Sequence, residues 1–182
     1  MISFKAMMRA KSRDFFWYSP VLKDRLDHVV ADFAVSPKTE AETETETETG
    51  VLQACYTHNL PVTTRGAGTG KYGQAMPLAG GCFLHRNKMN AVKEIHPGRV
   101  IVEPGCLLKD IDAACIAHSG QELRMFFSTW ATATIGGFIA GESGGVGRVR
   151  RGGLRDLGNI IRLRVVTMEA EPRVPEYTGV GA

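Results

Sequence analysis

The chain has 182 residues, which is room for one domain or for two small lobes that share a ligand. Hydrophobic residues make up 43% of it and charged residues 23%, so a packed core can form and global disorder is not expected. The net charge of only +3 argues against a dedicated nucleic-acid binder, which would carry a strong basic field.

The cysteines and the lack of long apolar runs indicate the compartment. The four cysteines form no CxxC pair, which excludes a zinc ribbon and a thioredoxin-type dithiol, and they lie among apolar residues or glycines. We therefore expect reduced thiols in a cytoplasmic protein. The chain has no HExxH motif, no membrane-length apolar run and no signal-peptide pattern, so neither a metal site nor an integral membrane segment is expected.

The chain begins with an arm, a strand and an acidic repeat. Residues 1–27 form the arm, whose bulky side chains either bury against the body, the favoured interpretation, or make a ligand-binding aromatic patch. Residues 28–35 predict a short buried strand. Residues 43–49, TETETET, have no apolar residue at helical or strand spacing. This run is predicted to be of low complexity and mobile, followed by a shortened helix at about residues 50–58.

The later elements follow from apolar patterning. Residues 107–119 predict an amphipathic helix with Leu108, Ile111 and Cys115 on its buried face and Gly120 as its stop. The runs that predict strands are 61–65, 81–85, 99–103 and 158–168. Residues 169–182 predict a polar tail without a packed element. This order of strands and helices is α+β in class.

A glycine-rich turn directly follows one predicted strand. Its residues are Arg65, Gly66, Ala67, Gly68, Thr69 and Gly70. Successive N–H groups in such a turn form a concavity suited to a phosphate. The turn lacks the third glycine of GxGxxG spacing and the Lys-Ser/Thr ending of a Walker A loop, so an ordinary glycine turn is the alternative. Arg65 either assists phosphate binding or is only a strand-end charge.

Residues 128–141 are dense in hydroxyl and small side chains and poor in charge. Thr134 is placed to cap a short helix, whose first amides include those of Gly136 and Gly137. Free amides and the helix dipole at that point favour an anionic group. The apolar residues between the glycines predict that the segment is anchored in a core.

The segments PVTTRGAGTG, MNAVKEIH, VIVEPGC, STWATATIGGFIA and GLRDLGNIIRLRVV occur here in one order. In this the chain resembles flavoproteins with a p-cresol methylhydroxylase (PCMH)-type FAD-binding domain, in the group of glycolate oxidase FAD subunits and D-lactate dehydrogenases. The resemblance implies a small βα lobe and the start of a second, antiparallel-sheet lobe, with FAD between them. We expect this domain at residues 28–168, in an incomplete, truncated form, since the rest of the second lobe and the substrate domain do not follow.

The resemblance also implies which residues contact FAD. The glycine turn would hold the pyrophosphate, the 104–105 turn would lie near the adenine, and residues 128–137 would line the pyrophosphate and flavin side. No histidine occurs in the glycine turn, so we expect non-covalent FAD. The implied cofactor residues are Arg65, Gly66, Ala67, Gly68, Thr69, Gly70, Pro104, Gly105, Ser128, Thr129, Thr134, Ile135, Gly136 and Gly137.

The activity implied by the resemblance is hydride transfer to flavin from a hydroxy acid or another CH–OH substrate. No catalytic residue is expected in this chain, and the substrate would be held by a missing or separate domain or by a partner chain. The alternative is a truncated non-catalytic remnant or structural module with weak or no nucleotide binding. Truncation, the acidic repeat and Glu142, a carboxylate near the implied diphosphate, favour this alternative. Nucleic-acid binding through the basic run 148–151 is not expected, because a solvated loop or a patch near the cofactor phosphates explains that run better.

Overall fold

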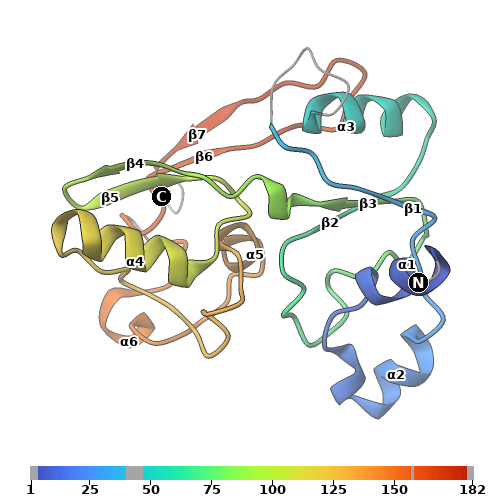
Figure 1. Ribbon diagram of the computed structural model, residues 1–182, viewed down its shortest axis with the longest axis horizontal. Helices are drawn as coiled ribbons and strands as arrows, with labels where there is room; N and C mark the ends of the chain where they lie inside the picture. The colour runs from blue at the N-terminus through green and yellow to red at the C-terminus, as the bar shows by residue number, and fades with distance from the viewer. Residues whose placement is uncertain (1–3, 40–46, 157, 180–182) are drawn as a thin grey trace.

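The computed structural model describes residues 4–39, 47–156 and 158–179 (Figure 1). The helices are α1 (Phe4–Lys11), α2 (Pro20–Leu26), α3 (Glu48–Thr57), α4 (Leu108–Ser119), α5 (Ile135–Ala140) and α6 (Arg148–Arg151), with 3-10 turns η1 (Phe16–Tyr18) and η2 (Arg86–Lys88). The strands are β1 (Phe33–Val35), β2 (Val62–Arg65), β3 (Cys82–His85), β4 (Val92–His96), β5 (Arg99–Val102), β6 (Arg162–Arg164) and β7 (Glu176–Thr178). None of the helices in these ranges is long and apolar enough to cross a membrane.

The N-terminal half builds a parallel sheet in the order β1-β3-β2. The central strand β3 carries Cys82, Phe83 and Leu84, all fully buried, as a parallel strand covered on both faces should be. Helix α3 covers one face, and α1 and α2 lie on the other (Figure 1). The predicted strands at 61–65 and 81–85 are thus confirmed, whereas β1 occupies only the last three residues of its predicted range.

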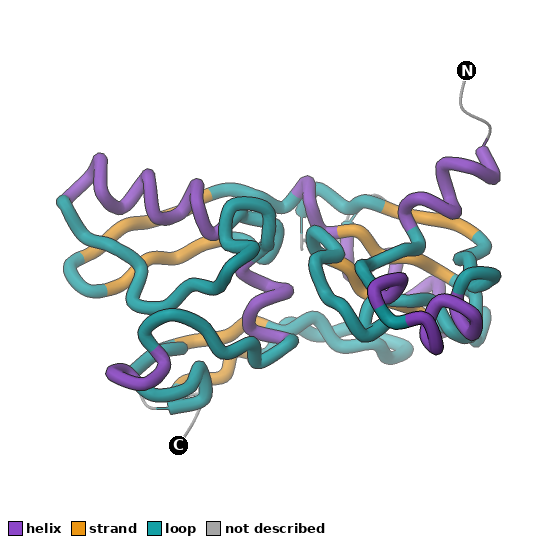
Figure 2. Tube along the Cα trace, turned by 90° about the horizontal axis from the view of Figure 1, so that it is seen from below, coloured by secondary structure: helices purple, strands orange, loops and turns teal. Residues whose placement is uncertain are grey.

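The second half begins with an antiparallel hairpin, β4–β5, packed against α4. Ile111 and Cys115 of α4 are buried against this hairpin, and Gly120 ends the helix in the left-handed conformation at φ 67°. The predicted helix and its stop are therefore confirmed. The two halves lie side by side in Figure 2. The architecture is α+β, with a parallel βα part followed by antiparallel strands, as expected.

A second hydrophobic core contains residues of both α4 and α5. Phe138 of α5 is buried in it, and its ring lies 4.8 Å from that of Phe127. Ile135 and Ile139 pack against the same core, which confirms that the 128–141 segment is anchored. The buried members of this core are Leu108, Met125, Ala133, Phe138, Leu154 and Ile160.

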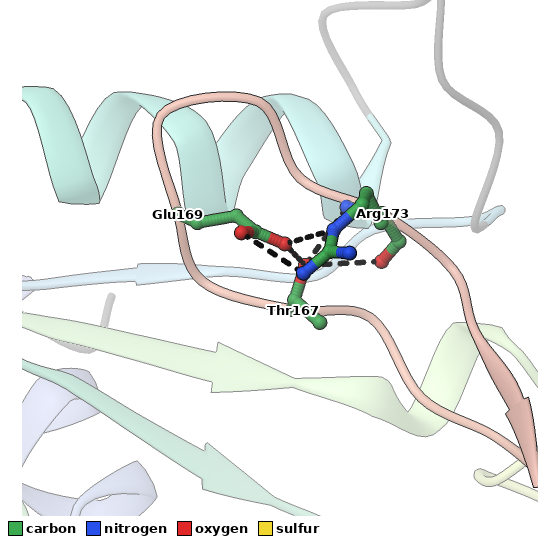
Figure 3. Close-up of polar contacts among 3 residues, drawn as sticks. All are labelled: Thr167, Glu169 and Arg173. Atoms are coloured by element: carbon green, nitrogen blue, oxygen red, sulfur yellow. Dashed lines mark hydrogen bonds and ion pairs between the residues drawn. The ribbon is translucent and has the colours of Figure 1, made fainter.

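The C-terminal residues correct one prediction. Residues 176–178 form β7, which pairs antiparallel with β6, so the predicted tail contains a regular strand, although all three of its residues are exposed. The connecting loop is closed by Arg173, which binds Glu169 through Nε at 2.8 Å and Thr167 Oγ1 through its backbone N–H at 2.8 Å (Figure 3). The loop then reaches α3, where Gln53 Nε2 donates to the Ala170 carbonyl at 3.0 Å.

The acidic repeat is also only partly as predicted. Residues 43–46 lie outside the described ranges, but its last three residues are buried and start α3. Thr47 Oγ1 caps the helix by accepting from the Gly50 N–H at 3.2 Å. Glu48 is only 1% exposed and forms an ion pair with Arg86. The mobility predicted for 43–49 is therefore wrong for residues 47–49, because this partner lies far along the chain.

The N-terminal arm buries less than expected. Phe16 is fully buried, but Phe15, Trp17 and Tyr18 are exposed, and the last two stack with ring centroids 4.2 Å apart. The predicted burial of the aromatic residues thus holds for Phe16 alone among these four.

Candidate cofactor site

The C-terminal ends of two neighbouring parallel strands lie at the same edge of the sheet. β2 ends at Arg65 and β3 at His85, and these two residues are register partners in the sheet. The glycine loop, residues 66–70, leaves β2, and η2 leaves β3. Ligands of such sheets bind beyond the carboxyl ends of the strands, so this edge is where a nucleotide is expected.

The glycine loop fits closely against neighbouring groups. A β-carbon on Gly66 would lie 2.0 Å from Thr134 Oγ1 in the second half of the chain. Gly68 has a φ of +70°, and a β-carbon there would lie 2.0 Å from Nη2 of Arg65. Only glycine combines such a conformation with so little space. The glycine loop therefore packs closely against its surroundings, and Thr134 is in contact with it.

The amides of this loop are free to bind a ligand. Within the described part of the chain, none of the backbone N–H groups of residues 66–70 donates a hydrogen bond. By contrast, the N–H of nearby Tyr72 donates to Gln74 Oε1 at 3.0 Å. A run of free amides around a tight turn is a favourable environment for phosphate oxygens. The residues present therefore fit the diphosphate of a dinucleotide.

The Arg65 side chain packs against the glycine loop. Its Nη1 donates to the Lys11 carbonyl at 2.7 Å, and its guanidinium lies 5.6 Å from the centre of the Phe83 ring. Burial lowers the pKa of Arg65, and the charge of Asp14 offsets part of that effect. Arg65 is thus more than a strand-end charge, because it packs under Gly68.

Backbone hydrogen bonds join the 104–106 turn to the 133–136 segment. The N–H of Ile135 donates to the Cys106 carbonyl at 2.8 Å, and that of Gly136 donates to the Pro104 carbonyl at 2.9 Å. A β-carbon on Gly105 would lie 2.1 Å from the Arg86 carbonyl, so this turn also requires glycine. These contacts bring the three predicted segments into one site.

One sequence-based expectation for α5 is wrong. Thr134 does cap α5, but its Oγ1 accepts from the Gly137 N–H at 3.3 Å, and the Gly136 amide is already bonded to Pro104. These amides are therefore not free for an anion. Their role is to fix Thr134 against the glycine loop.

A cavity of about 220 Å³ lies at this junction. It is smaller than the roughly 300–1,000 Å³ of a typical ligand pocket, so it suits one part of a dinucleotide. Three of its lining residues were predicted from the sequence, namely Ala67, Gly105 and Thr134. Those that the sequence reasoning missed are Asn87, Asn90, Leu107 and Asp110. Polar amides directly after a buried parallel strand were an available signal for Asn87 and Asn90.

The remaining predicted residues lie outside the cavity lining. Ser128 and Gly137 are exposed, and Thr129 is half-buried in a turn where its carbonyl accepts from the Ala133 N–H at 2.9 Å. Glu142, at φ 45°, forms an ion pair with Arg155 at 3.0 Å, which offsets its negative charge. A diphosphate nearby would therefore meet less repulsion than the sequence suggested.

A half-buried histidine, His85, lies next to the glycine loop. Burial lowers the pKa of His85, and the charges of Arg65 and Lys11 lower it further. Its Nδ1 is buried and has no hydrogen-bond partner in the described part of the chain. Among the described residues, no cluster of His, Cys, Asp and Glu side chains is suited to a metal ion.

Comparison with known families agrees with this geometry. A family described as an FAD binding domain matches residues 31–173, most of the chain. The chain therefore belongs to the PCMH-type FAD-binding domain family, and the cofactor of this family is FAD.

Individual relatives include an oxidoreductase and an oxidase subunit of greater length. An uncharacterised FAD-linked oxidoreductase of Mycobacterium tuberculosis is 30% identical over 76% of this chain and 29% of its own length. The glycolate oxidase subunit GlcD of Escherichia coli is 31% identical over 68% of this chain and 24% of its own length. The chain thus spans less than a third of these relatives.

Solved structures share the fold. An alkyldihydroxyacetonephosphate synthase superposes with a TM-score of 0.77 at 16% identity, covering 96% of this chain and 31% of that protein. Aclacinomycin oxidoreductase superposes with a TM-score of 0.69 at 17% identity, covering 96% of this chain and 32% of that protein.

Proposed function

We propose that this chain binds FAD non-covalently and forms the FAD-binding part of an oxidoreductase acting on a hydroxy acid or another CH–OH substrate. The observation that carries the proposal is the run of free amides at residues 66–70, opposite Thr134. FAD supplies hydride acceptance when it is bound, and the protein supplies binding and orientation.

The site divides into two chemical environments. The amides of 66–70 would hold the diphosphate, and the Thr134 hydroxyl, which already accepts from Gly137, has its proton free to donate to it. The 104–105 turn and the cavity residues Asn87, Asn90 and Asp110 would receive the adenosine end, which offers both donors and acceptors. This arrangement keeps the Asp110 carboxylate on the adenosine side.

The substrate class is supported by what the relatives are called. They include glycolate oxidase subunit GlcD, a rat mitochondrial D-2-hydroxyglutarate dehydrogenase and an Archaeoglobus fulgidus D-lactate dehydrogenase. Glycolate, 2-hydroxyglutarate and lactate all carry a hydroxyl beside a carboxylate. We assign no catalytic residue in this chain, so a further domain or a partner chain would hold the substrate. All four cysteines are free thiols, which supports a reducing compartment such as the cytoplasm.

The proposal is tested by titrating the purified protein with FAD and following flavin absorbance and fluorescence. Gly68→Ala adds a β-carbon to the glycine loop at a φ of +70°. This change should weaken FAD binding at least tenfold, because the loop would have to shift from its present conformation. Gly98→Ala is the matched control, because Gly98 has a φ of +75° but no atom within 4 Å of its added β-carbon. Equal loss in both variants, or no binding by the unaltered protein, would contradict the proposal and leave a non-catalytic module.

A further inference from the structure

We infer that residues 11–16 of the N-terminal arm brace the FAD-binding loop, and that Asp14 is a positioning residue for it. The inference rests on the proposed function. These residues precede the family match, which begins at residue 31, so membership of the family does not account for them.

The arm holds both ends of the glycine loop. At one end, Arg65 Nη1 donates to the Lys11 carbonyl at 2.7 Å. At the other end, the Phe15 N–H donates to the Gly70 carbonyl at 2.8 Å. Both ends of the loop are therefore held by hydrogen bonds to the same short segment, residues 11–16.

Asp14 lies between these two contacts and faces the loop. Its side chain is 4% exposed, and Oδ1 accepts from the Phe16 N–H at 2.8 Å. Its Oδ2 is buried, 3.4 Å from where a β-carbon on Gly70 would lie. Burial raises the pKa of Asp14, and the backbone N–H groups of Phe16, Gly73 and Ala75 together with the charge of Arg65 offset part of that effect. Its charge is therefore directed at the loop and at Arg65 beneath it.

The brace itself is fixed to the body. Ser12 is fully buried, and its Oγ accepts from the Ala31 N–H at 3.0 Å. Phe16 is fully buried as well. Two anchored residues thus flank Asp14, so the arm is rigid enough to restrain the loop.

The consequence for binding follows from conformational entropy. Three of the five residues in 66–70 are glycines, which lose more backbone freedom than other residues when they are ordered. A loop restrained before binding loses less freedom when the cofactor arrives, which raises affinity without any new contact to the ligand. Removing the brace should therefore loosen the loop and weaken FAD binding, although Asp14 lines no part of the cavity.

The test uses Asp14→Asn, which keeps the shape but removes the charge. In the protein without FAD, the backbone amide order parameters of residues 66–70, measured by 15N relaxation, should fall, while those of α4 and β4 stay unchanged. The dissociation constant for FAD should rise roughly tenfold. Asp24→Asn is the control, because Asp24 is an exposed residue of α2 on the same arm and should change neither readout.

A second pair of variants covers the case in which Asp14→Asn does not fold. Phe15 has a φ of −87°, close to the range of proline, so Phe15→Pro removes the N–H donor to Gly70 with little backbone change. Phe15→Ala keeps that donor and removes only the ring. Lower order parameters at residues 66–70 in Phe15→Pro, but not in Phe15→Ala, are the expected result.

The inference is overturned if the order parameters of the loop are unaltered in the brace variants, or if they fall evenly over the whole chain. It is overturned equally if FAD affinity stays the same while the loop loosens. Failure of the unaltered protein to bind FAD would instead contradict the proposed function, and the relaxation measurement separates these two failures because it needs no FAD.

Discussion

Gly66 and Thr134 touch across the two halves of the molecule: a β-carbon on Gly66 would lie 2.0 Å from Thr134 Oγ1 and 3.2 Å from Thr134 Cβ. The contact joins the loop after a parallel strand to the cap of α5. It explains why a glycine and a small hydroxyl residue stand at these two positions. The site exists only where these segments meet.

This contact predicts coupling between the two residues. Gly66→Ala should destabilise the protein by about 1–3 kcal/mol through overpacking, and Thr134→Ala by about 1 kcal/mol through loss of the cap. The double variant should be less destabilised than the sum, because removing Oγ1 relieves the clash. Denaturant unfolding of the four proteins measures the coupling, and strictly additive effects would show that the two residues do not touch.

The end of the acidic repeat should be structural. Glu48→Gln removes the buried negative charge that pairs with the half-buried Arg86, which should cost about 2 kcal/mol of unfolding free energy. Glu169→Gln is the control, since its pair with Arg173 lies on an exposed loop and should change stability little. Thermal unfolding of both variants measures this difference. A Glu48→Gln protein with unchanged stability would contradict a structural role for residues 47–49.

His85 predicts a pH effect on stability. Its pKa is lowered from 6.5 in the folded protein by burial, so the unfolded chain takes up a proton first as the pH falls. Stability should therefore decline as the pH drops below about 6.5 and level off below the folded-state pKa. His85→Asn should lack this part of the decline. Denaturant midpoints of both proteins between pH 7 and pH 5 measure the difference, and parallel curves would contradict the assignment.

The cysteines should be unreactive until the protein unfolds. All four are buried, and burial, reinforced by Cys55, raises the pKa of Cys82 to about 12. Thiolate is the reactive form, so Ellman's reagent at pH 8 should react slowly with the native protein and fully in denaturant. Rapid labelling of native Cys55 or Cys82 would show that α3 does not cover β3.

Local patterns were sufficient for some of this structure. The apolar run of β3, the amphipathic helix α4 and its Gly120 stop depend on neighbouring residues, and all three were predicted. The glycine loop was predictable as well, because positive φ and a close approach of the backbone both require glycine at Gly68.

Other features depend on partners that are distant in sequence. The burial of Glu48 depends on Arg86, and β7 is a strand only because it pairs with β6. Asn90 and Asp110 line a cavity that forms when four separate segments meet. Because no local pattern encodes such meetings, these features could be recognised only in the folded chain.

The central claim is that the amides of residues 66–70 hold the cofactor diphosphate. Amide proton signals of the 15N-labelled protein, recorded with and without FAD, test it residue by residue. The account predicts large shifts and slowed exchange at residues 66–70, with little change in exchange at Gly136, whose amide is already bonded to Pro104. FAD binding that leaves the 66–70 amides unaltered would contradict it.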